Sequence, residues 1–292
     1  MYIIMWLEVA SKILSESLLS LYPVFVKNIN LPLHLQLWSR FITYIVISGF
    51  FVNWGFIAET LFSKKGLALS LVTILHVYAS YRGFQLLESG VAYALFYTYP
   101  LIILLLAKTS LHPIMFLTVI GIILLCIPSK NIQEREKEKK EQKEEKEEKE
   151  PFETSSLFPL EGYLMIGLAA FTEAIIYFIV RSIKTKNSWN HLFLSYFIGT
   201  FFFSFLGLKE ISNITITSTL SISLFINAII GLCGYLLRFY SATRLSPAIY
   251  APLSYVGIII AYVYGFLFNG EQITIQKIIG TFCIIVSVLN IG

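Results

Sequence analysis

Long apolar runs separated by short polar gaps dominate the pattern along the chain. A helix needs about 20 mostly apolar residues to cross a bilayer core of about 30 Å. That length predicts ten membrane-spanning helices, and hence an all-α membrane protein. We expect the spans at residues 3–26, 33–52, 67–86, 89–107, 114–127, 158–183, 189–208, 220–242, 247–268 and 275–289.

Charged residues are concentrated in one segment between the fifth and sixth predicted spans. Residues 129–157 hold eight of the 22 Lys and Arg residues and ten of the 18 acidic residues, all of them Glu. The rest of the chain is left with 14 basic and eight acidic side chains, too few for a water-soluble surface. The pattern therefore predicts a five-helix unit over residues 1–128, a linker over 129–157, and a second five-helix unit over 158–292.

The distribution of basic residues in the short loops predicts the orientation, because such residues collect on the cytoplasmic side. With a cytoplasmic N-terminus, seven lie in inner loops and four in outer ones. The prediction is an integral, multi-pass protein of the cell membrane with both termini in the cytoplasm and the linker outside. The inner residues are Lys64, Lys65, Lys108, Arg181, Lys184, Lys186 and Arg244, and the outer ones Lys27, Arg82, Lys209 and Lys277.

The two predicted units repeat one another. The offset between matching positions drifts only from 157 to 159 residues, so the match is one continuous alignment. Each unit has an odd number of spans, so the second must enter the membrane from the opposite side. Inverted repeats of this kind are typical of secondary transporters, whose substrate site lies near the membrane midplane. The matched pairs include Glu16 with Glu173, Lys27 with Lys184, Tyr97 with Tyr255, and Gly121 with Gly280.

Several stretches outside the linker form motifs of one transporter family. They are residues 22–27, 39–41, 81–100, 241–256, 268–271 and Gly280. These motifs resemble the helices of EamA-type transporters in the drug/metabolite transporter superfamily. The resemblance implies ten helices in two inverted halves and alternating-access transport of small metabolites, without specifying the substrate. The chain departs from the family in its long charged linker and in Glu271, which has no counterpart after Ala107.

Two glutamates fall in the middle of predicted spans. Glu16 lies 11 residues before Lys27, which is about 16 Å along a helix, and Glu173 holds the equivalent position in the second unit. Ionisable groups inside a membrane are costly and are functional candidates by default. The two carboxylates could hold protons or pair with a cationic group of a substrate. The alternative is structural ion pairing, with Lys12 one turn before Glu16 and Arg181 two turns beyond Glu173.

Other polar side chains are predicted to face the same midplane region. Arg238 could bind a substrate carboxylate or phosphate through paired hydrogen bonds, or could be the partner of Glu16 or Glu173. His76 is a candidate substrate or proton ligand, with a hydrogen-bonded interior histidine as the alternative. Tyrosines could line a pocket, although ordinary packing also explains them. The predicted substrate site comprises Glu16, His76, Tyr93, Tyr97, Glu173, Tyr177, Arg238 and Tyr250.

The sequence thus favours a secondary transporter of a small polar metabolite, such as an amino acid or a nucleoside-like compound, with protons as a candidate coupling ion. A nucleotide-sugar or sugar-phosphate carrier, using Arg238 and Arg82 as anion contacts, is one alternative. A non-transporting membrane scaffold or receptor is the other. No motif of an enzyme, a cofactor site or a metal site is present, and the net charge of +4 gives no reason to expect nucleic acid. The oligomeric state stays open.

Overall fold

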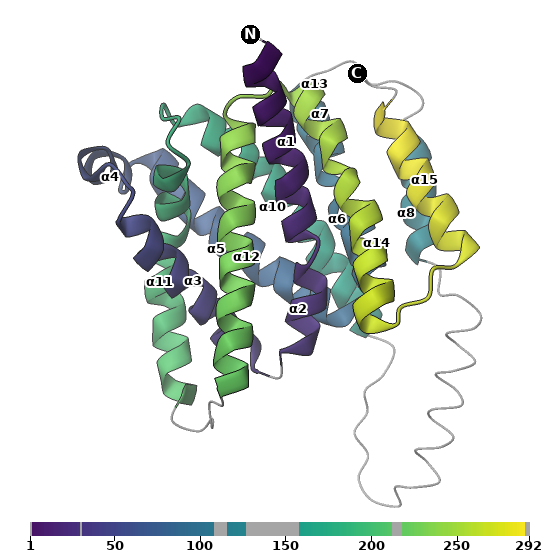
Figure 1. Ribbon diagram of the computed structural model, residues 1–292, viewed down its shortest axis with the longest axis horizontal. Helices are drawn as coiled ribbons and strands as arrows, with labels where there is room; N and C mark the ends of the chain where they lie inside the picture. Colours follow the sequence, from purple (N-terminus) through teal and green to yellow (C-terminus); the bar gives the residue numbers. More distant parts are fainter. Residues whose placement is uncertain (1, 30, 108–115, 127–157, 212–217, 290–292) are drawn as a thin grey trace, which may run out of the picture.

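The computed structural model describes residues 2–29, 31–107, 116–126, 158–211 and 218–289. Every regular element among these residues is a helix, and the helices pack into one bundle (Figure 1). The predicted linker and residues 212–217 lie outside the described residues. The first part of the chain forms α1 (Tyr2–Leu19), α2 (Tyr22–Asn28), α3 (Leu33–Gly49), α4 (Trp54–Thr60), α5 (Lys64–Leu86), α6 (Ser89–Phe96), α7 (Tyr99–Leu106) and α8 (Phe116–Cys126). The second part forms α10 (Phe158–Ser182), α11 (Ser188–Ile211), α12 (Ser218–Ala242), α13 (Pro247–Ser254), α14 (Val256–Asn269) and α15 (Ile275–Leu289).

Each span predicted from the sequence falls on one helix or on two consecutive helices. The helix predicted over residues 67–86 begins earlier, because the side chain of Ser63 caps it by accepting a hydrogen bond from the backbone N–H of Gly66 at 3.2 Å. The short helix α4 was not predicted. Its start is fixed in the same way by Asn53, which accepts a hydrogen bond from the N–H of Phe56 at 3.1 Å.

Five stretches of the described residues are long and apolar enough to cross a membrane, and a sixth arises if α4 and α5, bent by 88°, count as one span. The five are Trp6–Asn28, Ser89–Leu106, Leu160–Ser182, Leu220–Ala242 and Pro247–Asn269. Their length and composition support an integral, multi-pass membrane protein. The start of α1 and the end of α15 lie at the same end of the bundle (Figure 1).

Three of these stretches are broken near their middle. The breaks separate α1 from α2, α6 from α7, and α13 from α14. Pro23 and Pro100 each lie in the first turn after a break, where the missing N–H of proline costs nothing. Pro252 lies in the last turn of α13, just before the break at Tyr255. A proline therefore lies within one turn of each of the three breaks.

Apolar side chains cover the outside of the bundle and charged side chains lie inside it, which is the reverse of the arrangement in a water-soluble protein. Large apolar side chains cover the outside, including Phe50, Phe205 and Ile275, which are 82%, 84% and 76% exposed. The inside holds charged side chains, and Lys12 and Glu16 are completely buried. Lipid can cover the apolar exterior without cost, whereas charged groups in that position would need partners or water. A candidate functional site therefore lies in the centre of the bundle.

Candidate functional site

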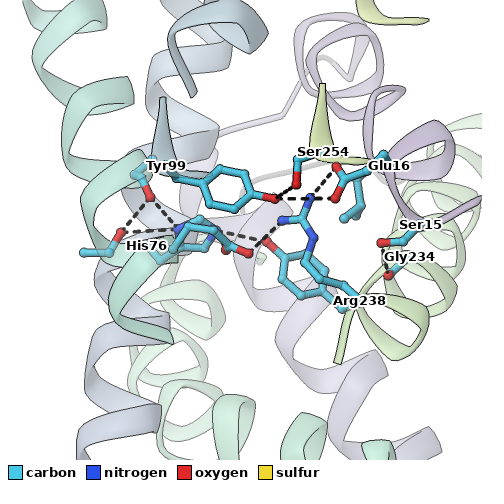
Figure 2. Close-up of polar contacts among 12 residues, drawn as sticks. Ser15, Glu16, His76, Tyr99, Gly234, Arg238 and Ser254 are labelled. Atoms are coloured by element: carbon cyan, nitrogen blue, oxygen red, sulfur yellow. Dashed lines mark hydrogen bonds and ion pairs between the residues drawn. The ribbon is translucent and has the colours of Figure 1, made fainter. Parts of the chain in front are cut away.

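Three charged side chains from three helices meet in the centre of the bundle. Arg238 of α12 donates from Nη2 to Oε2 of Glu16 on α1, and from Nη1 to Oε1 of Glu173 on α10, both at 2.8 Å. All three are at most 2% exposed. Figure 2 shows Arg238 between Glu16 on one side and His76 on the other. One guanidinium group thus joins the two carboxylates that the sequence analysis pairs in its predicted repeat.

The position of Glu16 is set by close packing of α1 against α12. The neighbouring residue, Ser15, donates its hydroxyl to the carbonyl oxygen of Gly234 at 2.8 Å (Figure 2). Gly234 has no side chain, and a Cβ atom there would lie 2.7 Å from Leu19 of α1. Small residues therefore allow the two backbones to approach closely enough for Arg238 to reach Glu16.

Glu16 has further partners besides Arg238. Lys12, one turn earlier on α1, forms an ion pair with Oε1, and Tyr97 donates its hydroxyl to Oε2. The Nζ atom of Lys12 also donates to the hydroxyl oxygen of Tyr99 at 3.0 Å and lies 3.7 Å from the centroid of the Tyr250 ring. The negative charge of Glu16 is therefore balanced by two cations, and Lys12 is held by aromatic rings on its other side.

His76 of α5 lies beside the second oxygen of Glu173. Its Nε2 is 3.2 Å from Oε2 of Glu173 and 3.0 Å from the hydroxyl oxygen of Tyr235, while its Nδ1 is 3.1 Å from the carbonyl oxygen of Ala169. A carbonyl oxygen only accepts, so Nδ1 carries a hydrogen. In a neutral imidazole Nε2 then has no hydrogen, and it faces Oε2 as a second acceptor. Among the described residues, Oε2 of Glu173 has no hydrogen-bond partner.

A second buried arginine, Arg40 of α3, lies among five tyrosine rings. Its guanidinium carbon is 4.7 to 5.5 Å from the ring centroids. Its Nη2 donates to the hydroxyl oxygen of Tyr196 at 2.6 Å, whereas its Nε finds no hydrogen-bond partner in the part of the chain that the structure describes. The five rings are those of Tyr22, Tyr44, Tyr81, Tyr196 and Tyr235.

Arg40 was missing from the predicted site. The sequence feature that makes Arg238 a candidate is also present at Arg40, because both guanidinium groups lie far from either end of an apolar span. In the sequence, residues 39–41 contribute only to the family resemblance. The cage could not be predicted, because its tyrosines come from α2, α3, α5, α11 and α12.

A small cavity of about 10 Å³ lies between the two arginines and has room for roughly one water molecule. Arg40, His76, Ser80 and Arg238 are part of its wall, together with the ring of Tyr93. The structure is therefore closed around a small polar centre.

The predicted site residues divide into groups. Tyr177 lies further out, with its ring centroid 4.8 Å from that of Tyr250 and its hydroxyl accepting a hydrogen bond from Arg181 at 3.3 Å. The anticipated pairing of Arg181 with Glu173 is not formed, since Arg181 donates to backbone carbonyls instead.

The other predicted site residues are brought together in the centre. The charged cluster contains Glu16, His76, Glu173 and Arg238, its aromatic neighbours are Tyr97 and Tyr250, and Tyr93 lines the cavity.

Ion pairing and hydrogen bonding are the chemistry that this centre offers. Among the described residues, no three His, Cys or Glu side chains are close enough to hold a metal ion. An apolar exterior, broken helices and a charged interior together define a multi-pass membrane protein with a polar site at its core.

The comparisons with known proteins point to one family. Residues 160–292 match the model of the EamA-like transporter family, which belongs to the drug/metabolite transporter superfamily. No curated protein matches the chain. One solved structure, whose title says only that it is the crystal structure of a protein, shares the fold with a TM-score of 0.58. The two sequences are 12% identical, and the match covers 97% of this chain and 94% of the other.

Proposed function

We propose that the protein is a secondary transporter with ten spans in two inverted five-helix halves, which moves a small polar metabolite by alternating access. The observation that carries this proposal is the binding of Glu16 and Glu173, one from each half, to the single guanidinium group of Arg238. A site shared by two inverted halves can be exposed to either side of the membrane as the halves rock. In this proposal the charged cluster and its cavity form the substrate site.

The packing of repeat-related residues supports the inverted repeat. A Cβ atom on Gly121 of α8 would lie 2.5 Å from the carbonyl oxygen of Gly280 on α15, and one on Gly280 would lie 3.0 Å from that of Gly121. The rings of Tyr97 and Tyr255, another matched pair, lie 6.5 Å apart. Equivalent residues contact each other when they lie close to the axis that relates two halves. The main helix contacts agree, because α1 packs on α12 while the equivalent α10 packs on α5.

Two joints at opposite ends of the bundle support alternating access. At one end Glu271 accepts hydrogen bonds from Lys27 at 3.1 Å and from the backbone N–H of Ser89 at 2.7 Å, joining the end of α2 to the start of α6. At the other end Arg181 of α10 donates to two carbonyls of the α12–α13 connection, at 2.9 and 2.6 Å (Figure 1). These joints are equivalent by the repeat and differ in chemistry. In a carrier they would open in turn.

The contact between His76 and Glu173 supports proton coupling as a finer part of the proposal. Their facing acceptor atoms, 3.2 Å apart, form a favourable contact only when a proton lies between them. Entry of a proton there would weaken the hold of Glu173 on Arg238, because a neutral carboxyl group attracts a guanidinium group less. A proton could thereby loosen the joint between the two halves.

Transport in proteoliposomes tests the proposal directly. Purified protein should be reconstituted and assayed for uptake of amino acids, nucleosides, sugar phosphates and organic cations at two pH values. The Glu16→Gln, Glu173→Gln double variant should lose pH dependence, whereas the Glu161→Gln control, outside the cluster, should keep it. Uptake of no class by a well-folded protein would overturn the transporter proposal. Transport that depends equally on pH in the wild type and the double variant would refute proton coupling alone.

The two alternatives make different demands. A sugar-phosphate carrier would use Arg82 as an anion contact, but Arg82 holds both oxygens of Glu161 at 2.7 and 3.1 Å near the surface. A scaffold would act through the linker, so deletion of residues 130–150 would abolish its function. In a carrier, the same deletion would leave ligand binding intact. We also propose that the protein lies in the cell membrane with both termini facing the cytoplasm. Accessibility labelling of introduced cysteines tests this orientation.

A further inference from the structure

The cage around Arg40 leaves one buried positive charge without a carboxylate partner. Arg40 is 1% exposed, and none of the described carboxylates forms an ion pair with it. Its aromatic neighbours contribute cation–π attraction and hydroxyl groups, but no negative charge. The unpartnered Nε atom shows that even the hydrogen-bonding capacity of the guanidinium is incompletely used.

The charges in the core of the bundle do not balance. Among the described residues, the buried cluster holds two carboxylates, Glu16 and Glu173, and three cations, Lys12, Arg40 and Arg238. Lys12 pairs with Glu16, and Arg238 pairs with both carboxylates, so the cation left without a carboxylate in this cluster is Arg40. An excess charge in the middle of a membrane protein is costly, and such a charge marks a binding site for the opposite sign.

The small, closed cavity next to Arg40 marks the place where an anion would bind once the site opens. Arg40 and Arg238 lie on its wall, with His76 and the hydroxyl of Ser80 as additional polar groups. The remaining wall is largely aromatic and includes Phe84 and Phe96. The ring of Tyr235 links the two arginines, with its centroid 5.0 Å from the guanidinium carbon of Arg40 and 5.4 Å from that of Arg238. A ligand here would have one anionic end and an apolar remainder.

We propose that Arg40 binds the carboxylate of a transported organic monoanion. This inference rests on the proposed transporter function and assigns its substrate class. A planar carboxylate accepts two parallel hydrogen bonds from a guanidinium group, and its single charge cancels the excess of one. A phosphate dianion would reverse the imbalance instead of removing it. The aromatic wall would contact the apolar part of the substrate when the closed cavity opens.

Binding of matched probe pairs tests the assignment. The purified protein in detergent should be titrated with benzoate, phenylacetate and hexanoate, and with the corresponding neutral amides. We expect the carboxylates to raise the melting temperature and the amides to have no effect. Arg40→Gln should weaken carboxylate binding at least tenfold. Arg40→Lys, which keeps the charge but loses the planar fork, should weaken it less, and both proteins should first be shown to be monodisperse.

Arg82→Gln is the matched control, because it removes an arginine near the surface and should leave carboxylate binding unchanged. Equal carboxylate binding by the wild type and Arg40→Gln would overturn the role of Arg40. Tighter binding of inorganic phosphate than of any carboxylate would overturn the substrate class. If a neutral or cationic compound is transported and Arg40→Gln leaves its transport intact, this inference fails while the transporter proposal stands. If the wild-type protein transports no class of compound, both fail.

Discussion

Glu16 and Glu173 bind opposite nitrogen atoms of the same guanidinium group, although they lie on different helices and in different halves of the chain. Each bond is 2.8 Å long. The arrangement concentrates the coupling between the two halves in one side chain, Arg238. A change at this residue should therefore affect the stability of the bundle and, in the proposed transport cycle, the movement of the halves relative to each other.

Arg238→Gln should strongly destabilise the protein. The change leaves Glu173 without a cationic partner in the centre of the bundle, and breaking a buried ion pair from one side typically costs about 3–5 kcal/mol. Unfolding in mixed detergent micelles measures this cost. Arg82→Gln, which breaks a partly exposed pair with Glu161, should cost less than about 1 kcal/mol. Similar losses in the two variants would contradict a central structural role for Arg238.

Gly231→Ala should lower stability through a steric clash. A Cβ atom at Gly231 would overlap the hydroxyl groups of Tyr22 and Tyr44, which are hydrogen-bonded to each other at 2.7 Å beside Arg40. Overpacking of this kind typically costs about 1–3 kcal/mol. Gly167→Ala is the control, since nothing lies within 4 Å of a Cβ atom there. Unfolding of the two variants under identical conditions gives the comparison, and equal stabilities would refute the close packing of α12 on α2 and α3.

Glu271 should make the stability of one joint depend on pH. Burial raises the pKa of this carboxyl, but the charge of Lys27 and the hydrogen bonds from Ser89 outweigh burial and hold the pKa below its ordinary value of 4.5. A carboxyl whose pKa is lowered on folding stabilises the folded state above its unfolded pKa, and the contribution is lost as the pH falls. The wild type should therefore be more stable than Glu271→Gln at pH 7, and the difference should shrink below about pH 4.5.

Melting curves of both proteins between pH 7 and pH 4 measure this effect. Lys27→Met provides a control, because loss of the cation should reduce the advantage of Glu271 at pH 7. A constant difference between wild type and Glu271→Gln at every pH would show that the carboxylate charge does not hold the joint.

His76→Gln should uncouple transport from protons if the proton between His76 and Glu173 drives the cycle. Accumulation driven by a pH gradient should fall at least tenfold, because the variant lacks the titrating imidazole. Exchange of labelled substrate across the membrane, which needs no net proton movement, should persist. His191→Gln is the matched control, since His191 is equally buried but bonds to the carbonyl of Thr185 away from the cluster. Unchanged accumulation in His76→Gln would remove His76 from the proton path.

Much of the helical organisation follows from local sequence. Apolar runs of sufficient length form helices in a membrane because each backbone group must find its hydrogen-bond partner within its own segment. Proline at positions 23, 100 and 252 marks the broken spans, because proline lacks the backbone N–H that a continuous helix needs. The short helix α4 escaped prediction, since it depends on the cap at Asn53 rather than on an apolar run. Repeat-related glutamates could also be located from spacing alone.

Partnership among the charged residues was decided by the tertiary structure. The sequence left Arg238 with several candidate roles, and the packing of α1, α10 and α12 gave it both carboxylates. Arg181, two turns beyond Glu173 on the same helix, instead reaches carbonyls near the start of α13. The sequence by itself thus determined which residues must be buried in the membrane. Only the three-dimensional arrangement determined that Arg40 lies among tyrosines from five helices, with no carboxylate of the described residues beside it. Such contacts depend on the positions of whole helices and not on the spacing within any one of them.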